Sequence, residues 1–233
     1  MKNNCISIII PTYNEKNNIV DLVNYLLEQN EGELKEILIM DAEKSTDQIE
    51  KIPFPAIVQI AKCDCTSRAA QFIHGASLAK GTVLYFLHAD TRPPKNYLQL
   101  ILGMFEKGYD FGMFKYKFDQ DKWYLRFNGW MTQWKAFYTG GGDQGLFIIK
   151  EQYHKVGGFD STKLIMEDYD LFWRLKKAKY AYQILKDNAI VSARKYDKNA
   201  SFKVNLVNLV VLWWFKFGGN QAKIKAFYNK HIV

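Results

Sequence analysis

The sequence is poor in cysteine and lacks both a second cysteine pair and a signal-peptide pattern. Its 233 residues include three cysteines, Cys5, Cys63 and Cys65, an odd number. Cys63 and Cys65 have no second pair at the spacing that completes a zinc site, so we expect three free thiols. The N-terminal MKNNCISIII enters an apolar strand without a cleavable signal. These features predict a protein of the reducing cytoplasm.

Long linkers, low-complexity tracts and internal repeats are absent as well. The chain is 48% hydrophobic, which is enough to bury one sizeable core at this length. We expect one domain over residues 1–199 and a C-terminal amphipathic helical appendage over residues 200–233. The apolar segment 204–217 is shorter than the about 20 residues that span a bilayer.

Positive charge is in excess. The sequence has 32 lysines and arginines against 24 aspartates and glutamates, a formal net charge of +8. Such a charge indicates anionic partners, whether phosphates, acidic lipid or nucleic acid. Because no recognition-helix or RNP-like signature accompanies it, we do not expect a nucleic-acid partner.

Apolar strands alternate with helices along the chain. Three consecutive isoleucines in IIIPTYNE, residues 8–15, predict a central strand that is covered on both faces and ends at Pro11. We therefore predict an α/β fold with three α/β/α layers around a largely parallel mixed sheet. Further strands are expected at 36–40, 56–60, 82–90, 109–118 and 145–149, and helices at 19–27, after Ser45, at 66–80, between Asp121 and Tyr138, from Met166 and at 204–217.

Polar side chains follow the carboxyl ends of the predicted strands, which is where open α/β sheets bind ligands. Thr12, Asn14 and Glu15 follow the first strand, while Asp41 and Asp90 each end a later one. Asp90 is suited to hold Mg²⁺ or Mn²⁺ and to leave coordination positions for substrate phosphates. The alternative is that Asp90 caps the turn that follows it, a common use of aspartate.

Five segments, in order, resemble family 2 glycosyltransferases of the GT-A fold. They are IIIPTYNE, Asp41 with the following Ser45-Thr46-Asp47, Arg68 in TSRAAQFIHGASLAKG, FLHAD, and MEDYDLFWRL. The resemblance covers residues 6–195. More narrowly, HADTRPP, GGDQGLF and EDYDL resemble a small bacterial subgroup associated with radical-SAM and selenoprotein-type gene clusters or with arsenosugar biosynthesis.

The resemblance implies a nucleotide-diphosphate sugar as donor and a hydroxyl as acceptor. The family's metal motif is Asp-x-Asp, and here it reads His88-Ala89-Asp90, so only Asp90 remains to hold Mn²⁺ or Mg²⁺. His88 would contact the ribose, or is instead a histidine satisfied by a buried hydrogen bond. The residues expected at the donor nucleotide are Pro11, Thr12, Asn14, Glu15, Asp41, Arg68, His88, Ala89 and Asp90.

The segment MEDYD is expected to open a helix. Acids in a first turn are favoured by the helix dipole whatever the function, so capping alone would explain them. The resemblance implies that Asp168 is the general base of an inverting transfer, with Glu167 as the next candidate. It also implies that Gly142, Asp143 and Gln144 contact sugar or acceptor. Arg194 and Lys195 would stabilise the diphosphate, or are ordinary surface cations.

Aromatic residues form a separate pattern. Trp123, Phe127, Trp130, Trp134 and Phe137 repeat at three- and four-residue spacing, which is typical of a core-facing helix. The segment 204–217, with its tryptophans and flanking lysines, is suited to lie at an anionic membrane surface. Its alternatives are packing against the aromatic stripe or in a homodimer. We thus expect the protein in the cytoplasm, either free or held peripherally at the inner face of the membrane.

The sequence as a whole predicts an inverting, metal-assisted glycosyltransferase of hexosyltransferase type. The alternative is a membrane-surface or partner-binding protein that has kept the nucleotide fold but lost transfer activity. The single carboxylate in HAD supports this alternative, whereas the intact EDYD segment argues against it.

Overall fold

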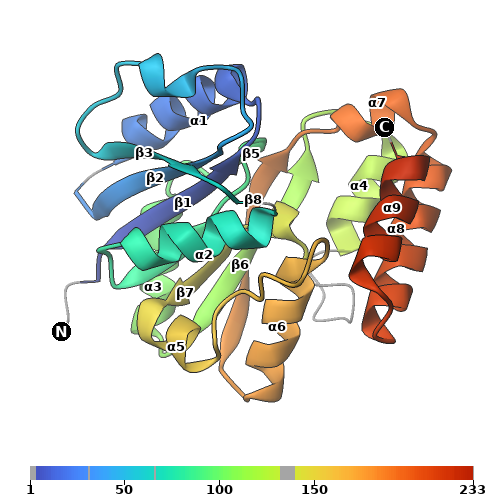
Figure 1. The fold of residues 1–233 in the computed structure, drawn as a ribbon. Helices are drawn as coiled ribbons and strands as arrows, with labels where there is room; N and C mark the ends of the chain where they lie inside the picture. The colour runs from blue at the N-terminus through green and yellow to red at the C-terminus, as the bar shows by residue number, and fades with distance from the viewer. Residues whose placement is uncertain (1–3, 31, 66, 132–139, 233) are drawn as a thin grey trace.

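The computed structural model describes residues 4–30, 32–65, 67–131 and 140–232 and shows one eight-stranded sheet with helices on both faces (Figure 1). The strand order is β3-β2-β1-β4-β7-β6-β8-β5. The strands are β1 Ile6–Thr12, β2 Leu34–Ala42, β3 Val58–Cys63, β4 Val83–Phe86, β5 Thr91–Arg92, β6 Phe111–Phe118, β7 Leu146–Ile149 and β8 Tyr182–Val191. The α-helices are α1 Lys16–Glu28, α2 Arg68–Leu78, α3 Tyr97–Glu106, α4 Trp123–Met131, α5 Lys150–Lys155, α6 Glu167–Lys177, α7 Arg194–Lys198, α8 Ser201–Lys216 and α9 Gln221–His231, with short 3₁₀ turns at Ile49–Lys51 and Gly142–Gln144.

The N-terminal half of the sheet is parallel, which confirms the predicted fold class. β1 pairs in parallel with β2 and β4, and β2 pairs in parallel with β3. Every residue of β1 is buried, because helices cover both faces of this central strand. The register sets Thr12 opposite Asp41, so the polar ends of β1 and β2 lie side by side.

Two strand ends differ from the prediction. β1 continues through Pro11 to Thr12, whereas β4 stops at Phe86 and leaves the HAD segment in a loop. Beyond Ile9, β1 has a strand partner only in β2. The position of Pro11 is therefore edge-like, and proline is tolerated there.

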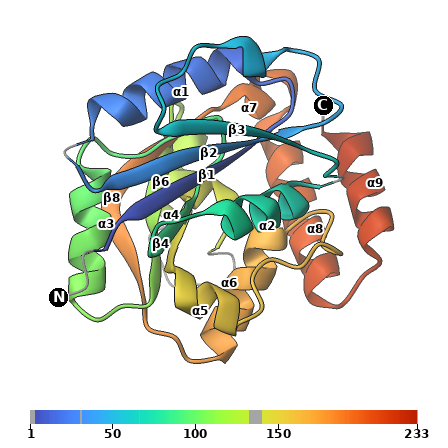
Figure 2. The same ribbon diagram turned by 60° about the vertical axis from the view of Figure 1, so that its left-hand side comes forward.

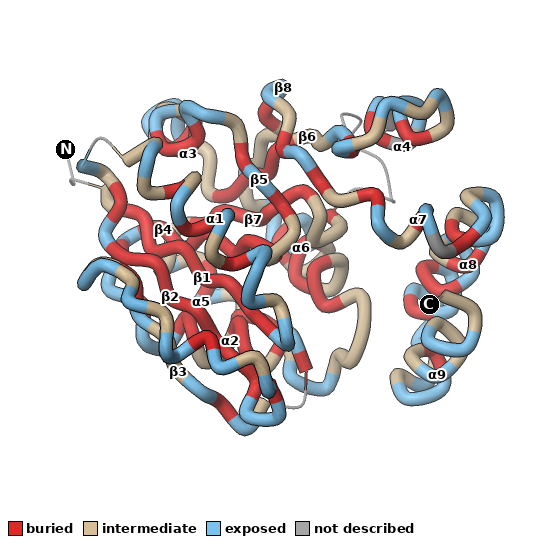
Figure 3. Tube along the Cα trace, turned by 90° about the horizontal axis from the view of Figure 1, so that it is seen from above, coloured by how far each residue is buried: buried red, intermediate tan, exposed pale blue. Residues whose placement is uncertain are grey.

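The C-terminal half of the sheet is mixed. β7 runs antiparallel to β4 and β6, while β8 runs parallel to β6 and antiparallel to β5. Two apolar cores fill the faces of the sheet: α1 and α3 cover one, and α2, α5 and α6 cover the other. Figures 2 and 3 show these helices around the buried strands.

The cysteines differ from the prediction. Cys63 and Cys65 are joined in a disulfide, and only Cys5 is a free thiol. The expectation of three free thiols is therefore wrong for Cys63 and Cys65, which are two residues apart in the sequence. A reducing compartment no longer follows from the cysteines.

The aromatic stripe of α4 is not core. Trp123 is 75% exposed, Phe127 55% and Trp130 53%, because α4 packs on β6 through other positions such as the buried Leu125. Trp134 and Phe137 lie outside the described residues. Along the described chain, no helix combines the length and apolar character that crossing a membrane requires.

Candidate functional site

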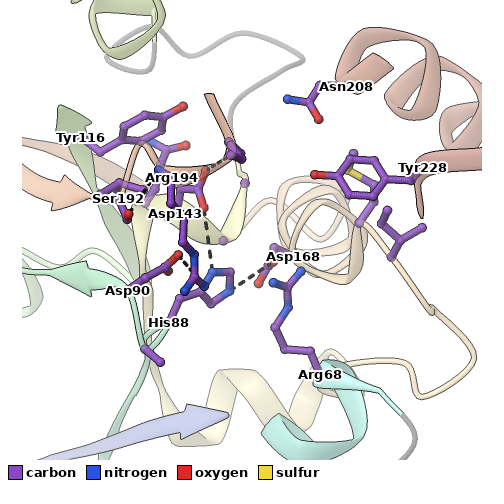
Figure 4. Close-up of a pocket in the computed structure, with 18 of the residues that line it drawn as sticks. Arg68, His88, Asp90, Tyr116, Asp143, Asp168, Ser192, Arg194, Asn208 and Tyr228 are labelled. Atoms are coloured by element: carbon purple, nitrogen blue, oxygen red, sulfur yellow. Dashed lines mark hydrogen bonds and ion pairs between the residues drawn. The ribbon is translucent and has the colours of Figure 1, made fainter. Parts of the chain in front are cut away.

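A cavity of about 920 Å³ opens at the carboxyl ends of β1 and β4. Its far wall comes from α6, α8 and α9, so segments from both ends of the chain meet around it (Figure 4). Most of the predicted site residues line it, namely Pro11, Thr12, Glu15, Arg68, His88, Ala89, Asp90, Gly142, Asp143, Gln144, Asp168, Arg194 and Lys195. Asn14, Asp41 and Glu167 are not among its lining residues.

Asp41 is buried and Asn14 is exposed, and both side chains contact the loops beside the cavity. The Asp41 carboxylate is fully buried, accepts a 2.9 Å hydrogen bond from Thr12 Oγ1 and lies 2.7 Å from Lys62 Nζ. Asn14 has a φ of +54° and its Oδ1 accepts a 2.8 Å hydrogen bond from the Thr46 amide. In the structure both side chains support neighbouring loops, and the contact with a donor nucleotide that we expected of them stays a prediction.

His88 lies between two acidic side chains. Its Nδ1 is 3.9 Å from Asp143 Oδ1, and its Nε2 is 3.9 Å from Asp168 Oδ2 (Figure 4). Both separations exceed hydrogen-bond length, and Nε2 is buried without a hydrogen-bond partner among the described residues. Burial, and then the Arg68 cation, lower the pKa of His88 to about 4, so the imidazole is neutral at physiological pH.

Gly142 makes this close arrangement sterically feasible. A Cβ on Gly142 would collide with the His88 ring and with Asp168 Oδ2. The turn containing Gly142 is held on β6 by Gln144, which donates from Nε2 to the Phe114 carbonyl at 3.1 Å and accepts from the Gly140 amide at 3.1 Å. The Gln144 amide that we expected to recognise sugar or acceptor thus also has a structural role.

The first turn of α6 carries three acids, Glu167, Asp168 and Asp170, and the first two have different surroundings. Arg68 at the start of α2 forms a hydrogen-bonded ion pair with Glu167, whose side chain is 2% exposed. Burial raises the pKa of Glu167, but the Arg68 guanidinium outweighs burial and lowers it. For Asp168, burial and the charge of Glu167 raise the pKa well above its usual value.

Three more cation–carboxylate pairs lie at the cavity. Arg194 lies 3.3 Å from Asp90 and 2.7 Å from Glu15, and Lys195 lies 3.4 Å from Asp143. Burial and the neighbouring Asp143 raise the pKa of Asp90, with Arg194 acting against them. The cavity therefore contains Arg68, Arg194 and Lys195, cations suited to an anionic ligand.

The donor atoms fit a divalent cation that the ligand would help to hold. No group of three or more potential ligands gathers in the part of the chain that the structure describes. However, Mg²⁺ is commonly held by one or two carboxylates together with substrate phosphates. Asp90 lines the cavity with its side chain 24% exposed, and its one ion-pair partner among the residues that the structure describes is Arg194.

Several residues of the site were not anticipated. Gln71 in α2 donates from Nε2 to the carbonyls of Thr12 at 2.8 Å and Met40 at 2.7 Å, which ties the ends of β1 and β2 together. Its signal in the sequence would have been a polar residue on the buried face of a predicted helix. Other lining residues come from β6, the end of β8, α8 and α9: Tyr116, Ser192, Asn208 and Tyr228.

Solved structures share this fold. The mannosyltransferase PcManGT from Pyrobaculum calidifontis, in complex with GDP-Man and Mn²⁺, superposes with a TM-score of 0.67 at 14% identity, over 91% of this chain and 64% of that one. TarS 1–349 of S. aureus gives a TM-score of 0.65 at 16% identity, over 96% of this chain and 69% of that one, and its complex with UDP-GlcNAc gives 0.64. The chain thus spans just under two thirds of the mannosyltransferase.

Sequence comparison gives the family. No curated protein sequence matches the chain. Residues 7–164, well over half of the chain, match the family described as glycosyl transferase family 2. That range includes the β1 loop, Arg68, the HAD segment and the glycine-rich turn at the cavity. The chain belongs to glycosyl transferase family 2.

Proposed function

We propose that this protein is an inverting glycosyltransferase that moves a hexosyl group from a nucleotide-diphosphate sugar to a hydroxyl acceptor. One observation carries the proposal: Asp90 and Asp168, from distant segments, line the same cavity on either side of His88. GDP-Man, UDP and UDP-GlcNAc are bound by the structural neighbours and support a donor of this class. The HADTRPP and GGDQGLF motifs support a place in the radical-SAM- or arsenosugar-associated subgroup.

Asp168 is the proposed general base. Its carboxylate lies at the cavity and forms no ion pair with a lysine or arginine among the described residues, and its raised pKa makes the ionised form a stronger base. Asp168 takes the acceptor proton while the acceptor oxygen bonds to C1 of the sugar. The C1–oxygen bond to the diphosphate breaks on the opposite face, and its electron pair leaves with the diphosphate.

Cations stabilise the departing diphosphate. Arg194 and Lys195 at the start of α7 face the cavity, as does Arg68, and permanent charges here offset the developing negative charge. Asp90 would hold the Mn²⁺ or Mg²⁺ ion, which supplies further charge neutralisation when bound. In this assignment Glu167 fixes Arg68 rather than acting as the base.

The test is release of nucleoside diphosphate with and without added acceptor, using a donor found by thermal-shift screening of nucleotide sugars. Asp168→Asn is expected to bind donor normally and to lower transfer by about 10²- to 10⁴-fold, the usual contribution of a general base. Asp170→Asn is the matched control, because it lies on the same helix but its carboxylate pairs with Arg174 at 2.8 Å. Full turnover by Asp168→Asn would discard the assignment.

The alternative function is donor binding without transfer, which the single carboxylate of HAD favours. A protein of that kind would bind a nucleotide sugar but release no diphosphate at any acceptor concentration. The same assay therefore separates the two functions.

A further inference from the structure

Helix α8 has apolar side chains on two opposite faces. Val204, Val207, Val211 and Phe215 are buried, and the last three pack with Ile224 of α9. The opposite face is exposed and repeats at the same helical spacing: Phe202, Leu206, Leu209, Val210, Trp213 and Phe217. Phe202 is 79% exposed and Phe217 76%. Helix α8 therefore has a second apolar face, which remains in solvent.

Helix α4 also carries exposed apolar residues. Trp123, Phe127 and Trp130 project from that helix into solvent. Phe127 of α4 and Leu209 of α8 line the same cavity, so the two helices flank one mouth. α4 and α8 also lie on the same side of the molecule in Figures 1 and 3. We name the exposed apolar residues of α4 and α8 together the aromatic face.

The charge around the aromatic face distinguishes between two candidate partners, a second copy of this chain and an anionic lipid surface. Residues 201–233 contain five lysines and neither aspartate nor glutamate. Helix α4 itself has no acidic residue, and its Arg126 pairs with Asp121 at 3.4 Å, so the excess positive charge comes from the lysines of residues 201–233. A second copy of the chain would bring like charges together, whereas an anionic lipid surface would complement them.

We propose that the aromatic face docks the protein on the surface of an anionic bilayer. Exposed tryptophan and phenylalanine side chains enter the boundary between headgroups and acyl chains, and the lysines contact the acidic headgroups. The protein lies on the membrane rather than across it, in keeping with the lengths of its described helices. This inference does not depend on transfer activity.

Docking has one consequence that rests on the proposed function. Because Phe127 and Leu209 belong to both the aromatic face and the cavity wall, the mouth of the cavity meets the bilayer. An acceptor hydroxyl carried on an amphiphile therefore reaches Asp168 from the lipid side.

Co-sedimentation with vesicles tests the docking. We expect the full chain to bind vesicles of equal parts phosphatidylcholine and phosphatidylglycerol, to bind phosphatidylcholine alone at least about tenfold more weakly, and to be released by salt. The double variant Phe202→Ser/Phe217→Ser should lower binding by about tenfold or more, or about 1.4 kcal/mol. Neither residue lines the cavity, so donor binding should not change.

Leu78→Ser is the matched control, because Leu78 is 44% exposed at the end of α2, outside the aromatic face. It should bind vesicles as the wild type does. Sedimentation velocity without lipid tests the alternative that a second copy covers the face. The proposal would be overturned if the wild type were a dimer that Phe202→Ser/Phe217→Ser dissociates and if the wild type did not bind vesicles. Equal binding to neutral and anionic vesicles would overturn its electrostatic part. Vesicle binding by a protein without transfer activity would refute only the proposed function.

Discussion

Glu167 and Asp168 are neighbours in the chain, yet only one of them has a cation of its own. Arg68 pairs with Glu167, whereas Asp168 has no such pair among the described residues: the His88 ring, 3.9 Å away, is neutral at physiological pH. The pKa of Glu167 is lowered and that of Asp168 is raised, so the two carboxyls differ in proton affinity. This difference supports the proposal that Glu167 stays charged and positions Arg68, whereas Asp168 exchanges a proton.

The Arg68–Glu167 pair predicts an asymmetric response to mutation. Arg68→Gln leaves a carboxylate that is 2% exposed without its cation and should cost about 3 kcal/mol of unfolding free energy. Glu167→Gln leaves an arginine that is 45% exposed and still hydrated, so it should cost less than about 1 kcal/mol. Urea unfolding of both variants measures the difference. Equal losses of unfolding free energy in the two variants would mean that the burial of Glu167 does not set the cost of breaking the pair.

Asp168 should lower stability at neutral pH. Its folded-state pKa is raised by burial first and then by Glu167, so the folded state binds the proton more tightly than the unfolded state does. The stability gained from protonated Asp168 is full below the unfolded pKa of about 4 and is lost as pH rises through the folded value. Asp168→Asn should therefore raise Tm by a few degrees at pH 7, since 1 kcal/mol is worth roughly 2–4 °C at this size.

The gain in Tm should shrink toward zero as the pH approaches about 4, where Asp168 is protonated in both states. Calorimetry at neutral and acid pH checks it. A variant that is less stable than the wild type at pH 7 would show that Asp168 has a stabilising partner. Transfer activity should show the complementary trend and fall as acid protonates the base.

Substitution of Gly142 by alanine tests the packing of the site, and the same substitution at Gly103 is its control. Gly142→Ala brings a methyl group against His88 and Asp168 and should cost about 1–3 kcal/mol, with loss of transfer. Gly103 lies within α3 with no atom within 4 Å of an added Cβ. Gly103→Ala should therefore be neutral or gain up to about 1 kcal/mol from helix propensity. Thermal unfolding and the transfer assay measure both, and a fully active Gly142→Ala would show that this contact is not needed.

The parallel half of the sheet could be predicted because its signals are local. The isoleucine run of β1 and the apolar run of β2 are typical of buried strands whichever strands they pair with. β8 lacks such a run, since Lys186, Asp187 and other exposed positions interrupt it. What makes β8 a strand is pairing with β6, a segment far away in sequence. The sequence therefore predicted the first half of the sheet better than the second.

The motifs predicted which segments meet at the cavity but not where each side chain points. Asp41 ends β2 at the expected edge, yet its carboxylate turns toward Thr12 and Lys62. That direction depends on a lysine in the neighbouring strand β3, which no motif includes. Asn208 and Tyr228 reach the cavity only because α8 and α9 pack beside α6. The packing of helices on a distant wall has no counterpart in a linear motif.

Asp90 should link donor affinity to a divalent cation. Since Asp90 is the only carboxylate left in HAD, Asp90→Ala is expected to weaken binding of UDP or GDP by about 10- to 100-fold in Mn²⁺, or about 1.4–2.8 kcal/mol. In chelator the variant and the wild type should bind alike, because neither then has the metal bridge to the phosphates. Asp21→Ala, on α1 with a side chain that is 70% exposed, is the control for a lost surface acid. Calorimetric titration in Mn²⁺ and in chelator gives all the affinities, and a wild type that binds equally in both would assign the diphosphate to Arg68, Arg194 and Lys195 alone.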